Sequence, residues 1–241
     1  MLDKDSPLPL YHQLKKVIEE HIDSQEWLPG MRLPSERELC DQFQVSRITV
    51  RQAITELVNA GRLNRHQGIG TFVASPRIEQ NLTHLVGFTQ DMQARGKRPG
   101  SRIIEQKALP APPHIARALQ IQSGDSMVML KRLRLTDGEP MAIEIAYLPG
   151  SICDGLAEED MHDRSLYKLL MTKYHVFPSR AEQQLQAIAC PAPEAQLLGI
   201  AKGSPVLHIY RLSFSPEGRP VEYTESYYRG DRYVFQVELS T

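Results

Sequence analysis

The first part of the chain carries a helical pattern of apolar positions. Spacings of three and four residues recur in two stretches, and such spacing gathers apolar side chains on one face of a helix. The stretches contain Leu10, Leu14, Val17, Ile18 and Ile22, and then Val50, Ala53, Ile54 and Leu57. Between them, Ser35 and Glu38 form the S-x-x-E pattern of a capping box, and Ser46 stands where it can cap the later stretch. We predict three helices, the second through Phe43 and the third ending near Gly61.

After the third predicted helix the pattern changes to alternation. The segment LNRHQGIGTFV, residues 63–73, alternates side chains and has glycines at 68 and 70, which is typical of a β-hairpin with a glycine tip. Two helices joined by a short turn and followed by a hairpin predict a winged helix-turn-helix domain. The polar, proline-containing segment 74–81 marks a boundary. We therefore expect a domain at 1–74, a linker at 75–81 and a second domain at 82–241.

The second domain contains an internal repeat. Residues 109–149 and 190–230 share P-A-P, a short helix, a glycine, a strand ending in R-L and a turn closed by proline. Each copy then has a second strand with a tyrosine seven residues after that proline, Tyr147 or Tyr227. Two units of helix, strand, turn and strand predict an α+β domain with an antiparallel sheet and approximate two-fold symmetry.

Composition narrows the class of protein. Hydrophobic residues make up 41% of the chain and charged residues 24%, as in ordinary globular proteins. No apolar run reaches the roughly 18 residues of a membrane helix, and the start of the chain lacks a signal-peptide pattern, so we expect a cytoplasmic protein with no membrane partner. Cys40, Cys153 and Cys190 are widely spaced and form no CxxC, which argues against disulfides and structural zinc. We expect no metal, no cofactor and no catalytic residues.

Charge is distributed unevenly along the first domain. Residues 42–75 hold four arginines and one glutamate, whereas residues 1–41 hold nine acidic and five basic residues. Projected on a helical wheel, Thr49, Arg51, Gln52 and Thr55 point away from the apolar face, with Arg47 at the margin. These side chains can bind phosphates or base edges. Two arginines on a helix are, in isolation, more often a solvated face; their combination with two caps, a short turn and a hairpin favours DNA binding.

The tip of the predicted hairpin has a shape suited to DNA. Its glycines are flanked by Arg65, His66 and Gln67, so a slim basic tip would fit a minor groove that excludes a bulky one.

In the repeat, polar residues gather on one strand face. Side chains two residues apart share a face, which places Arg132 beside Arg134, and Glu144 between two alanines on the partner strand. In the second copy Ser213 replaces Arg134, and one face carries Glu222, Thr224, Ser226 and Tyr228. These residues predict a polar cavity with a cationic end and a carboxylate end; the alternative is that the arginines are solvent-exposed.

A helix start adds a further candidate. Ser165 is placed to cap a helix, with Tyr167 two residues on. It is either a plain cap or part of an anion site at the helix N-terminus, facing the two arginines.

Three segments of the first domain carry a family resemblance: LYHQLKKVIEEHI, LPSERELCDQFQVSRITVRQAITELVNAGRL and RHQGIGTFV. Together they resemble the N-terminal domain of the GntR family of bacterial transcription regulators, without a gap from Leu10 to Val73. The resemblance implies DNA contacts from Arg37, Arg47, Thr49 and Arg51, with Gln67 and Gly68 at the wing. Ser46 and Gln52 of the same helix complete the candidate DNA-binding residues.

The second domain resembles the effector domain of the HutC branch of that family in FTQDMQARGKRPGSR, KRLRLTDGEPMAIE and YRGDRYVF. This implies a chorismate-lyase-like fold over residues 81–239. Within the branch the chain is most similar to the regulators of N-acetylglucosamine use, which bind amino-sugar 6-phosphates. That similarity implies phosphate contacts from Thr89, Arg132, Arg134, Ser165 and Tyr167, and sugar contacts from Glu144, Glu222 and Tyr228. Relatives in the branch sense other sugar phosphates, urocanate or fatty acids.

We therefore expect a regulator, acting as a repressor, that binds double-stranded operator DNA as a homodimer. A dimer is expected because one winged helix contacts few base pairs, and linked half-sites multiply the affinity. The expected effector is a small phosphorylated ligand, glucosamine 6-phosphate or N-acetylglucosamine 6-phosphate. Two alternatives remain at this stage: a lyase-like enzyme, although no catalytic motif is present, and an architectural DNA binder without a ligand.

Overall fold

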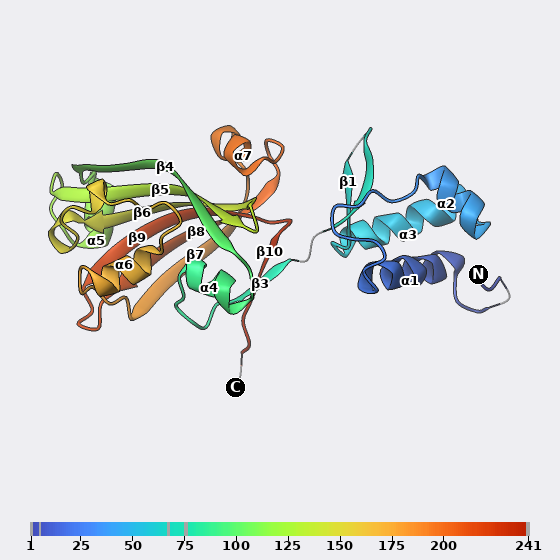
Figure 1. Ribbon diagram of the computed structural model, residues 1–241, viewed down its shortest axis with the longest axis horizontal. Helices are drawn as coiled ribbons and strands as arrows, with labels where there is room; N and C mark the ends of the chain where they lie inside the picture. The colour runs from blue at the N-terminus through green and yellow to red at the C-terminus, as the bar shows by residue number, and fades with distance from the viewer. Residues whose placement is uncertain (1, 5, 67, 75–76, 240–241) are drawn as a thin grey trace. The chain divides into compact units, whose positions relative to one another are not determined.

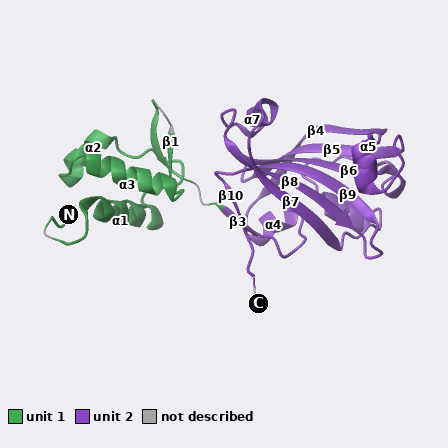
Figure 2. Cartoon of the chain, turned by 180° about the vertical axis from the view of Figure 1, so that it is seen from behind, with its two compact units in different colours: residues 1–77 green, residues 78–241 purple. Residues whose placement is uncertain are grey.

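The computed structural model describes residues 2–4, 6–66, 68–74 and 77–239. It divides the chain into two compact units, residues 1–77 and 78–241, which are coloured separately in Figure 2. Each unit has a hydrophobic core of its own. Within the described residues, no helix combines the length and the apolar composition needed to cross a membrane.

The first unit contains the predicted winged helix-turn-helix. Its elements are α1 (Leu10–Asp23), α2 (Glu36–Phe43), α3 (Arg47–Asn59), β1 (Leu63–His66) and β2 (Gly70–Val73). The capping box is formed, because the Ser35 side chain accepts the Glu38 N–H while the Glu38 side chain accepts the Ser35 N–H. Ser46 caps α3 by accepting the Thr49 N–H at 3.2 Å. Residues 44–46 form the turn, which begins with Gln44 in the left-handed region.

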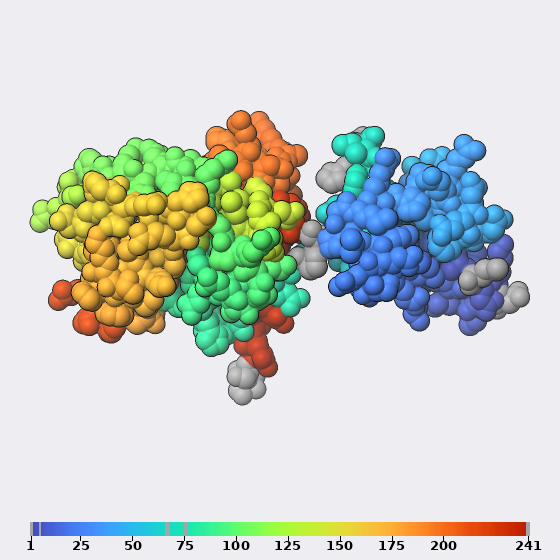
Figure 3. Space-filling view, in the orientation of Figure 1, coloured from blue at the N-terminus to red at the C-terminus, as the bar shows by residue number. Residues whose placement is uncertain are grey.

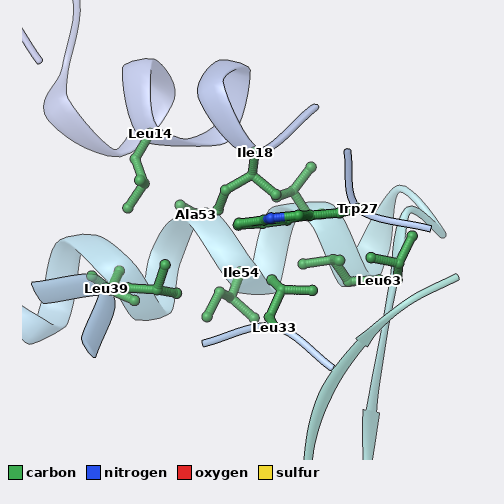
Figure 4. Packing of buried hydrophobic residues seen from close by; sticks show 11 residues of the cluster. Leu14, Ile18, Trp27, Leu33, Leu39, Ala53, Ile54 and Leu63 are labelled. Atoms are coloured by element: carbon green, nitrogen blue, oxygen red, sulfur yellow. The ribbon is translucent and has the colours of Figure 1, made fainter. Parts of the chain in front are cut away.

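The core of this unit lies between α1 and α3. Figure 4 shows Leu14 and Ile18 of α1 facing Ala53 and Ile54 of α3, with the ring of Trp27 between Ile18 and Ile54. All five side chains are buried, and fully burying one side chain of leucine or isoleucine size stabilises a fold by about 1.5–3 kcal/mol. This packing fixes the rotation of α3 about its axis, and with it the residues that α3 presents to solvent.

The hairpin is attached to the loop before α2. Strands β1 and β2 pair antiparallel, with Leu63 opposite Val73, and Arg32 forms an isolated bridge with Phe72. Gly70 has φ of +147°, which residues with a side chain rarely adopt, and an added Cβ atom would lie 2.8 Å from Arg32 Nε, so a larger residue would strain the backbone and displace the arginine. Gln67, predicted at the wing, lies outside the described residues.

The second unit is built on a six-stranded antiparallel sheet of order β4-β5-β6-β9-β8-β7. The strands are β4 (Pro99–Pro110), β5 (Ser126–Thr136), β6 (Glu139–Pro149), β7 (Arg180–Ala189), β8 (Pro205–Phe214) and β9 (Pro220–Arg229). The two copies of the repeat form the two halves of the sheet and meet at the β6–β9 pair. The predicted α+β fold is confirmed, and each half gains an outer strand, β4 or β7, that precedes the repeated helix.

Helices cover both faces of this sheet (Figure 1). α4 (Phe88–Ala94) and α6 (Leu166–Thr172) pack on the face formed by the even-numbered residues of β5, and α5 (Pro113–Leu119) and α7 (Ala192–Leu198) on the opposite face. Two short 3₁₀ helices, η1 (Gly150–Ile152) and η2 (Leu156–Glu158), lead from β6 towards α6. Polar residues of β5 and β9 therefore lie beneath helices.

The domain boundary differs from the expected linker at 75–81. Residues Ile78–Asn81 form β3, which pairs in parallel with β10 (Tyr233–Gln236). Ile78 and Gln80 are 7% and 6% exposed. The segment looked like a linker because it is short and polar and its partner strand lies some 150 residues further on. It belongs to the second unit, which begins at residue 78.

Candidate functional site

The first candidate surface is the outer face of α3. Arg51, Gln52 and Thr55 are exposed, as the helical projection predicted, and Arg47 is exposed as well. Thr49 is half-buried, with its Oγ1 atom 2.8 Å from Ser46 Oγ. This arrangement follows from the apolar stripe of α3, whose four predicted residues are all buried.

Three arginines of this surface share one carboxylate. Glu36 Oε2 lies 3.2 Å from Arg47 Nε and 3.1 Å from Arg51 Nε, and Glu36 Oε1 lies 3.0 Å from Arg65 Nη2. We call these four residues the arginine cluster. Neither Glu36 nor Arg65 was among the residues predicted to contact DNA. Glu36 gave no signal beyond its place as the first residue of a capped helix, whereas Arg65 was visible in the basic flank of the wing.

A groove joins α3 to the wing. Its lining comes from the loop before α2, from α3 and from the hairpin, and includes Arg32, Glu36, Arg51, Arg65 and Gly68. Gly68 has φ of +76°, a conformation that favours glycine at the tip. The structure thus brings the predicted residues Arg51 and Gly68 to one groove.

Among the described DNA-binding candidates, five do not line this groove: Arg37, Ser46, Arg47, Thr49 and Gln52. Arg37 is exposed on α2 but is not among the groove residues. Ile48 and Ile69, which the sequence analysis passed over, are 78% and 62% exposed. The signal for Ile48 was its position off the buried stripe of α3; Ile69 stands between the two wing glycines.

The second candidate site is a polar pocket between the sheet and the helices α4 and α6. It is lined by Gly87, Phe88, Thr89, Arg132, Arg134, Glu144, Ser165, Leu166, Tyr167, Glu222 and Thr224. Seven of the eight predicted effector contacts are in this lining. The eighth, Tyr228, is buried nearby, opposite Ala142 in the β6–β9 ladder and edge-on to Tyr233.

The cationic end of the pocket is buried. Arg132 and Arg134 are 3% and 2% exposed, so the alternative of solvent-exposed strand arginines is wrong. Arg132 lies opposite Glu144 in the β5–β6 ladder, donates from Nη2 to Glu144 Oε1, and donates from Nη1 to the carbonyl oxygen of Arg164 at 3.2 Å. The register of the β5–β6 ladder shifts after Arg134, where Met141 of β6 is the extra residue.

Arg134 is incompletely paired. Its Nη2 donates to Thr89 Oγ1 at 2.9 Å, and its guanidinium lies 4.5 Å from the ring centre of Phe88. Its Nε and Nη1 atoms are buried and have no hydrogen-bond partner in the structure. Burial and the neighbouring Arg132 lower the pKa of Arg134 to about 10, so it remains charged at neutral pH. Buried unpaired charge of this kind is costly and attracts an anion.

The carboxylate end contains two acids with opposite pKa shifts. Burial raises the pKa of Glu144, but Arg132 and Arg134 outweigh it and the net pKa is lowered. Glu222 is 3% exposed and accepts hydrogen bonds from Tyr167 Oη at 3.0 Å and Ser213 Oγ at 3.2 Å. Burial and the nearby Glu144 raise the pKa of Glu222 to about 7. The pocket therefore holds one fixed negative charge and one that titrates near neutrality.

Arg211 is a charged neighbour that sequence reasoning missed. It lies opposite Thr224 in the β8–β9 ladder and donates from Nε to Gln183 Oε1 at 2.7 Å. Burial lowers its pKa, but Tyr167, Tyr228 and Glu222 raise it further, and the net shift is upward. The repeat contained the signal, because aligning the two copies places Arg211 at the position of Arg132.

Ser165 caps α6 and also lines the pocket. Its Oγ accepts the Lys168 N–H at 3.2 Å, which confirms the cap, while its part in an anion site stays a prediction. A second groove between α4 and α6 shares Gly87, Thr89, Ser165 and Tyr167 with the pocket. In Figure 3 the two segments border each other on one face, α4 in green and α6 in orange. The groove and the pocket therefore lie on either side of the same four residues.

Among the described residues, no three histidine, cysteine, aspartate or glutamate side chains lie together in a way that could hold a metal ion.

Comparison with known proteins covers both units. Residues 10–73 match the bacterial regulatory proteins of the gntR family, and residues 94–234 match the UTRA domain. The chain is 42% identical over 235 residues to the HTH-type transcriptional repressor NagR of Bacillus subtilis (strain 168), covering 97% of this chain and 96% of that protein. It is 30% identical to the probable fructoselysine utilization operon transcriptional repressor of Escherichia coli (strain K12), over 98% of this chain and 97% of the relative.

A solved structure extends the similarity to the fold. The crystal structure of PhnF from Mycobacterium smegmatis matches with a TM-score of 0.67 and 30% identity, covering 97% of this chain and all of that one. The winged helix, the sheet domain and the sequence matches agree. The chain belongs to the GntR family of bacterial DNA-binding transcription regulators, with a UTRA domain as its second unit.

Proposed function

We propose that this protein is a repressor whose binding to operator DNA is controlled by a small phosphorylated ligand held in the polar pocket. The observation that supports the ligand most is Arg134, a buried guanidinium whose Nε and Nη1 atoms have no hydrogen-bond partner, beside a second buried arginine. A phosphate would supply acceptors to both arginines, and buried charge-assisted hydrogen bonds of this type are strong. We propose no catalytic role for the pocket, since its named relatives are regulators.

The proposed DNA contacts come from α3, α2 and the wing. Arg47, Thr49, Arg51 and Gln52 would read or hold the major groove, with Ser46 at the start of the helix and Arg37 on phosphate. Gly68 and its neighbour Gln67 would approach the minor groove. The exposed Ile48 offers an apolar contact to a thymine methyl group.

Control by a ligand requires two arrangements of the DNA-binding units. In the proposed homodimer, two winged helices bind the two half-sites of an operator, and the ligand must bind one arrangement more tightly than the other to shift the equilibrium. A ligand with equal affinity for both would change nothing, however tightly it binds. We propose that the regulator works on cytoplasmic DNA and that ligand binding releases it.

An amino-sugar 6-phosphate is the proposed ligand. Arg132 and Arg134, with Thr89, Ser165 and Tyr167, would hold the phosphate, while Glu144 and Glu222 would accept hydrogen bonds from sugar hydroxyl or amino groups, with Tyr228 packed behind them. This proposal follows the resemblance to the regulators of N-acetylglucosamine use. Another sugar phosphate would use the same cationic end.

A thermal-shift panel tests the ligand. The panel contains glucosamine 6-phosphate, its N-acetyl form, trehalose 6-phosphate, urocanate and inorganic phosphate. At about 100 times the dissociation constant, a specific ligand adds roughly 2.7 kcal/mol to the stability of the folded state. We expect the amino-sugar phosphates to give the largest shift and Arg134→Met to remove it. A shift of the same size in the variant would place the ligand elsewhere.

A gel-shift titration tests the DNA interface. The probe is a duplex selected from a random library by the full-length protein. We expect Arg51→Ala to lower the affinity for this duplex by roughly ten- to a hundredfold, the usual range for one bidentate base contact. Undiminished binding by the variant would contradict the assignment of α3 as the recognition helix.

A further inference from the structure

Glu36 lies where three elements of the first unit meet. It is the first residue of α2, and its carboxylate contacts Arg47 in the first turn of α3, Arg51 one turn later and Arg65 on strand β1 of the wing. Its side chain is 21% exposed, whereas those of the three arginines are 72%, 62% and 42% exposed. The carboxylate thus sits beneath three guanidiniums that face solvent.

The electrostatics keep this carboxylate ionised. Burial raises the pKa of Glu36, but its hydrogen bond with Arg47 and the charges of Arg51 and Arg65 outweigh that effect, and the net pKa is lowered. At neutral pH the arginine cluster therefore carries three positive charges and one negative charge. The position of Glu36 at the N-terminus of α2 also favours a negative charge on its side chain.

Such an anion has two opposite effects on DNA binding. It ties the side chains of Arg47, Arg51 and Arg65 to one point, which reduces the freedom they lose when they meet a defined array of base edges and phosphates. It also offsets part of their attraction for any polyanion, and that attraction supplies most of the binding to non-specific DNA. Both effects increase the difference between specific and non-specific affinity.

We propose that Glu36 is a positioning residue that sets the discrimination between operator and non-operator DNA. This inference rests on the proposed DNA interface. Glu36 contacts no base itself; it holds three guanidiniums from α3 and β1 in one arrangement and restrains their non-specific binding to phosphates. Discrimination is a difference between two affinities, so weakening the wrong complex counts as much as strengthening the right one.

The test compares two duplexes of equal length and composition. One is selected from a random library by the wild-type full-length protein, and the other is its scrambled sequence; fluorescence anisotropy gives both affinities at several NaCl concentrations. We expect Glu36→Gln to raise the affinity for scrambled DNA roughly tenfold and to change that for the selected duplex by less than about threefold. The ratio of the two affinities then falls.

Glu38→Gln is the matched control. It removes the same charge from the same helix, but Glu38 accepts the Ser35 N–H in the capping box rather than contacting the arginine cluster, and glutamine preserves that box. We expect this variant to keep the wild-type affinity ratio. An equal ratio in Glu36→Gln and Glu38→Gln would overturn the inference, because net charge would then explain every change.

Glu36→Asp separates position from charge. It keeps the negative charge on a shorter side chain, so the inference predicts a lower affinity ratio with little gain for scrambled DNA. A wild-type ratio in this variant would overturn the positioning role, and the variant also carries the test if Glu36→Gln does not fold. A failure of the proposed function would give a different result: the wild type would select no duplex, or Arg51→Ala would bind the selected duplex as well as the wild type does.

Discussion

The two units each hold a carboxylate among arginines, in opposite surroundings. Around Glu36 the guanidiniums of Arg47, Arg51 and Arg65 are largely exposed, whereas Arg132 and Arg134 beside Glu144 are almost fully buried. Exposed ion pairs are screened and contribute little to stability, so their partners can be exchanged for DNA phosphates. Buried charges are neither screened nor exchanged freely, so an imbalance among them is costly and a matching anion binds strongly.

Removing the carboxylate from each cluster gives the largest expected contrast. Glu144→Gln leaves two buried arginines without their anion and should destabilise the second unit by about 3–5 kcal/mol, while Glu36→Gln should change the first unit by less than about 1 kcal/mol. Urea unfolding separates the units, because Trp27 is the only tryptophan and reports the first unit, while far-ultraviolet circular dichroism follows the sheet. Equal losses would show that burial does not decide the strength of these pairs.

Glu222 of the second unit and Glu36 of the first should contribute pH dependences of opposite sign to the stability of their units. Folded Glu222 keeps its proton up to about pH 7, whereas an unfolded glutamate loses it near pH 4.3. Stability of the second unit should therefore fall by up to about 4 kcal/mol between these values and level off above them. The lowered pKa of Glu36 instead makes its contribution present above the ordinary glutamate pKa and lost as pH falls. Urea unfolding at several pH values measures these changes in the free energy of unfolding, with Glu222→Gln as control. If the second unit of this variant loses stability with rising pH as the wild type does, a group other than Glu222 is responsible.

Arg134 and Arg132 should respond differently to the same substitution. Arg134→Met removes an incompletely paired charge and should leave the unliganded second unit as stable as before, or more stable by up to about 2 kcal/mol. Arg132→Met should destabilise it, because Glu144 loses its direct partner. Thermal unfolding without ligand compares the two. Equal destabilisation by the two substitutions would mean that Arg134 stabilises the unliganded fold, which would contradict its proposed role in binding an anion.

Salt gives the smallest and most selective effect. Raising NaCl from 50 to 500 mM should shrink the already small stability difference between wild type and Glu36→Gln by about 0.5 kcal/mol or less, since exposed pairs are screened. The deficit of Glu144→Gln should stay constant over the same range. Parallel urea titrations at both concentrations measure this, and a salt-sensitive deficit at Glu144 would indicate that water reaches the pocket.

Local patterns predicted most of the fold. The three helices, both serine caps and the hairpin follow from neighbours within a few residues, and the repeat predicted the halves of the sheet. The strand β3 could not be found in this way, because one isoleucine and three polar residues form a strand only by pairing with β10 at the far end of the chain.

The sites were predictable only where they follow from strand period or family motif. The same-face rule correctly placed Arg132, Arg134 and Glu144 together but could not show that α4 and α6 bury them. Glu36 was not predicted as a site residue, because its three arginine partners lie 11, 15 and 29 residues further along the chain, on two other elements. Arg211 could have been predicted from the repeat, because both copies have an arginine at this position, Arg132 in the first and Arg211 in the second.

The pairing of β3 with β10 limits the reach of the DNA-binding unit. Val73 ends the wing and Ile78 begins β3, so five Cα-to-Cα steps join the units and span at most about 18 Å. The length of this segment therefore sets an upper limit on the distance between Val73 and Ile78, and with it the reach of a winged helix tethered through β3. In a dimer, half-sites spaced beyond that reach can be bridged only if the anchoring strands themselves move.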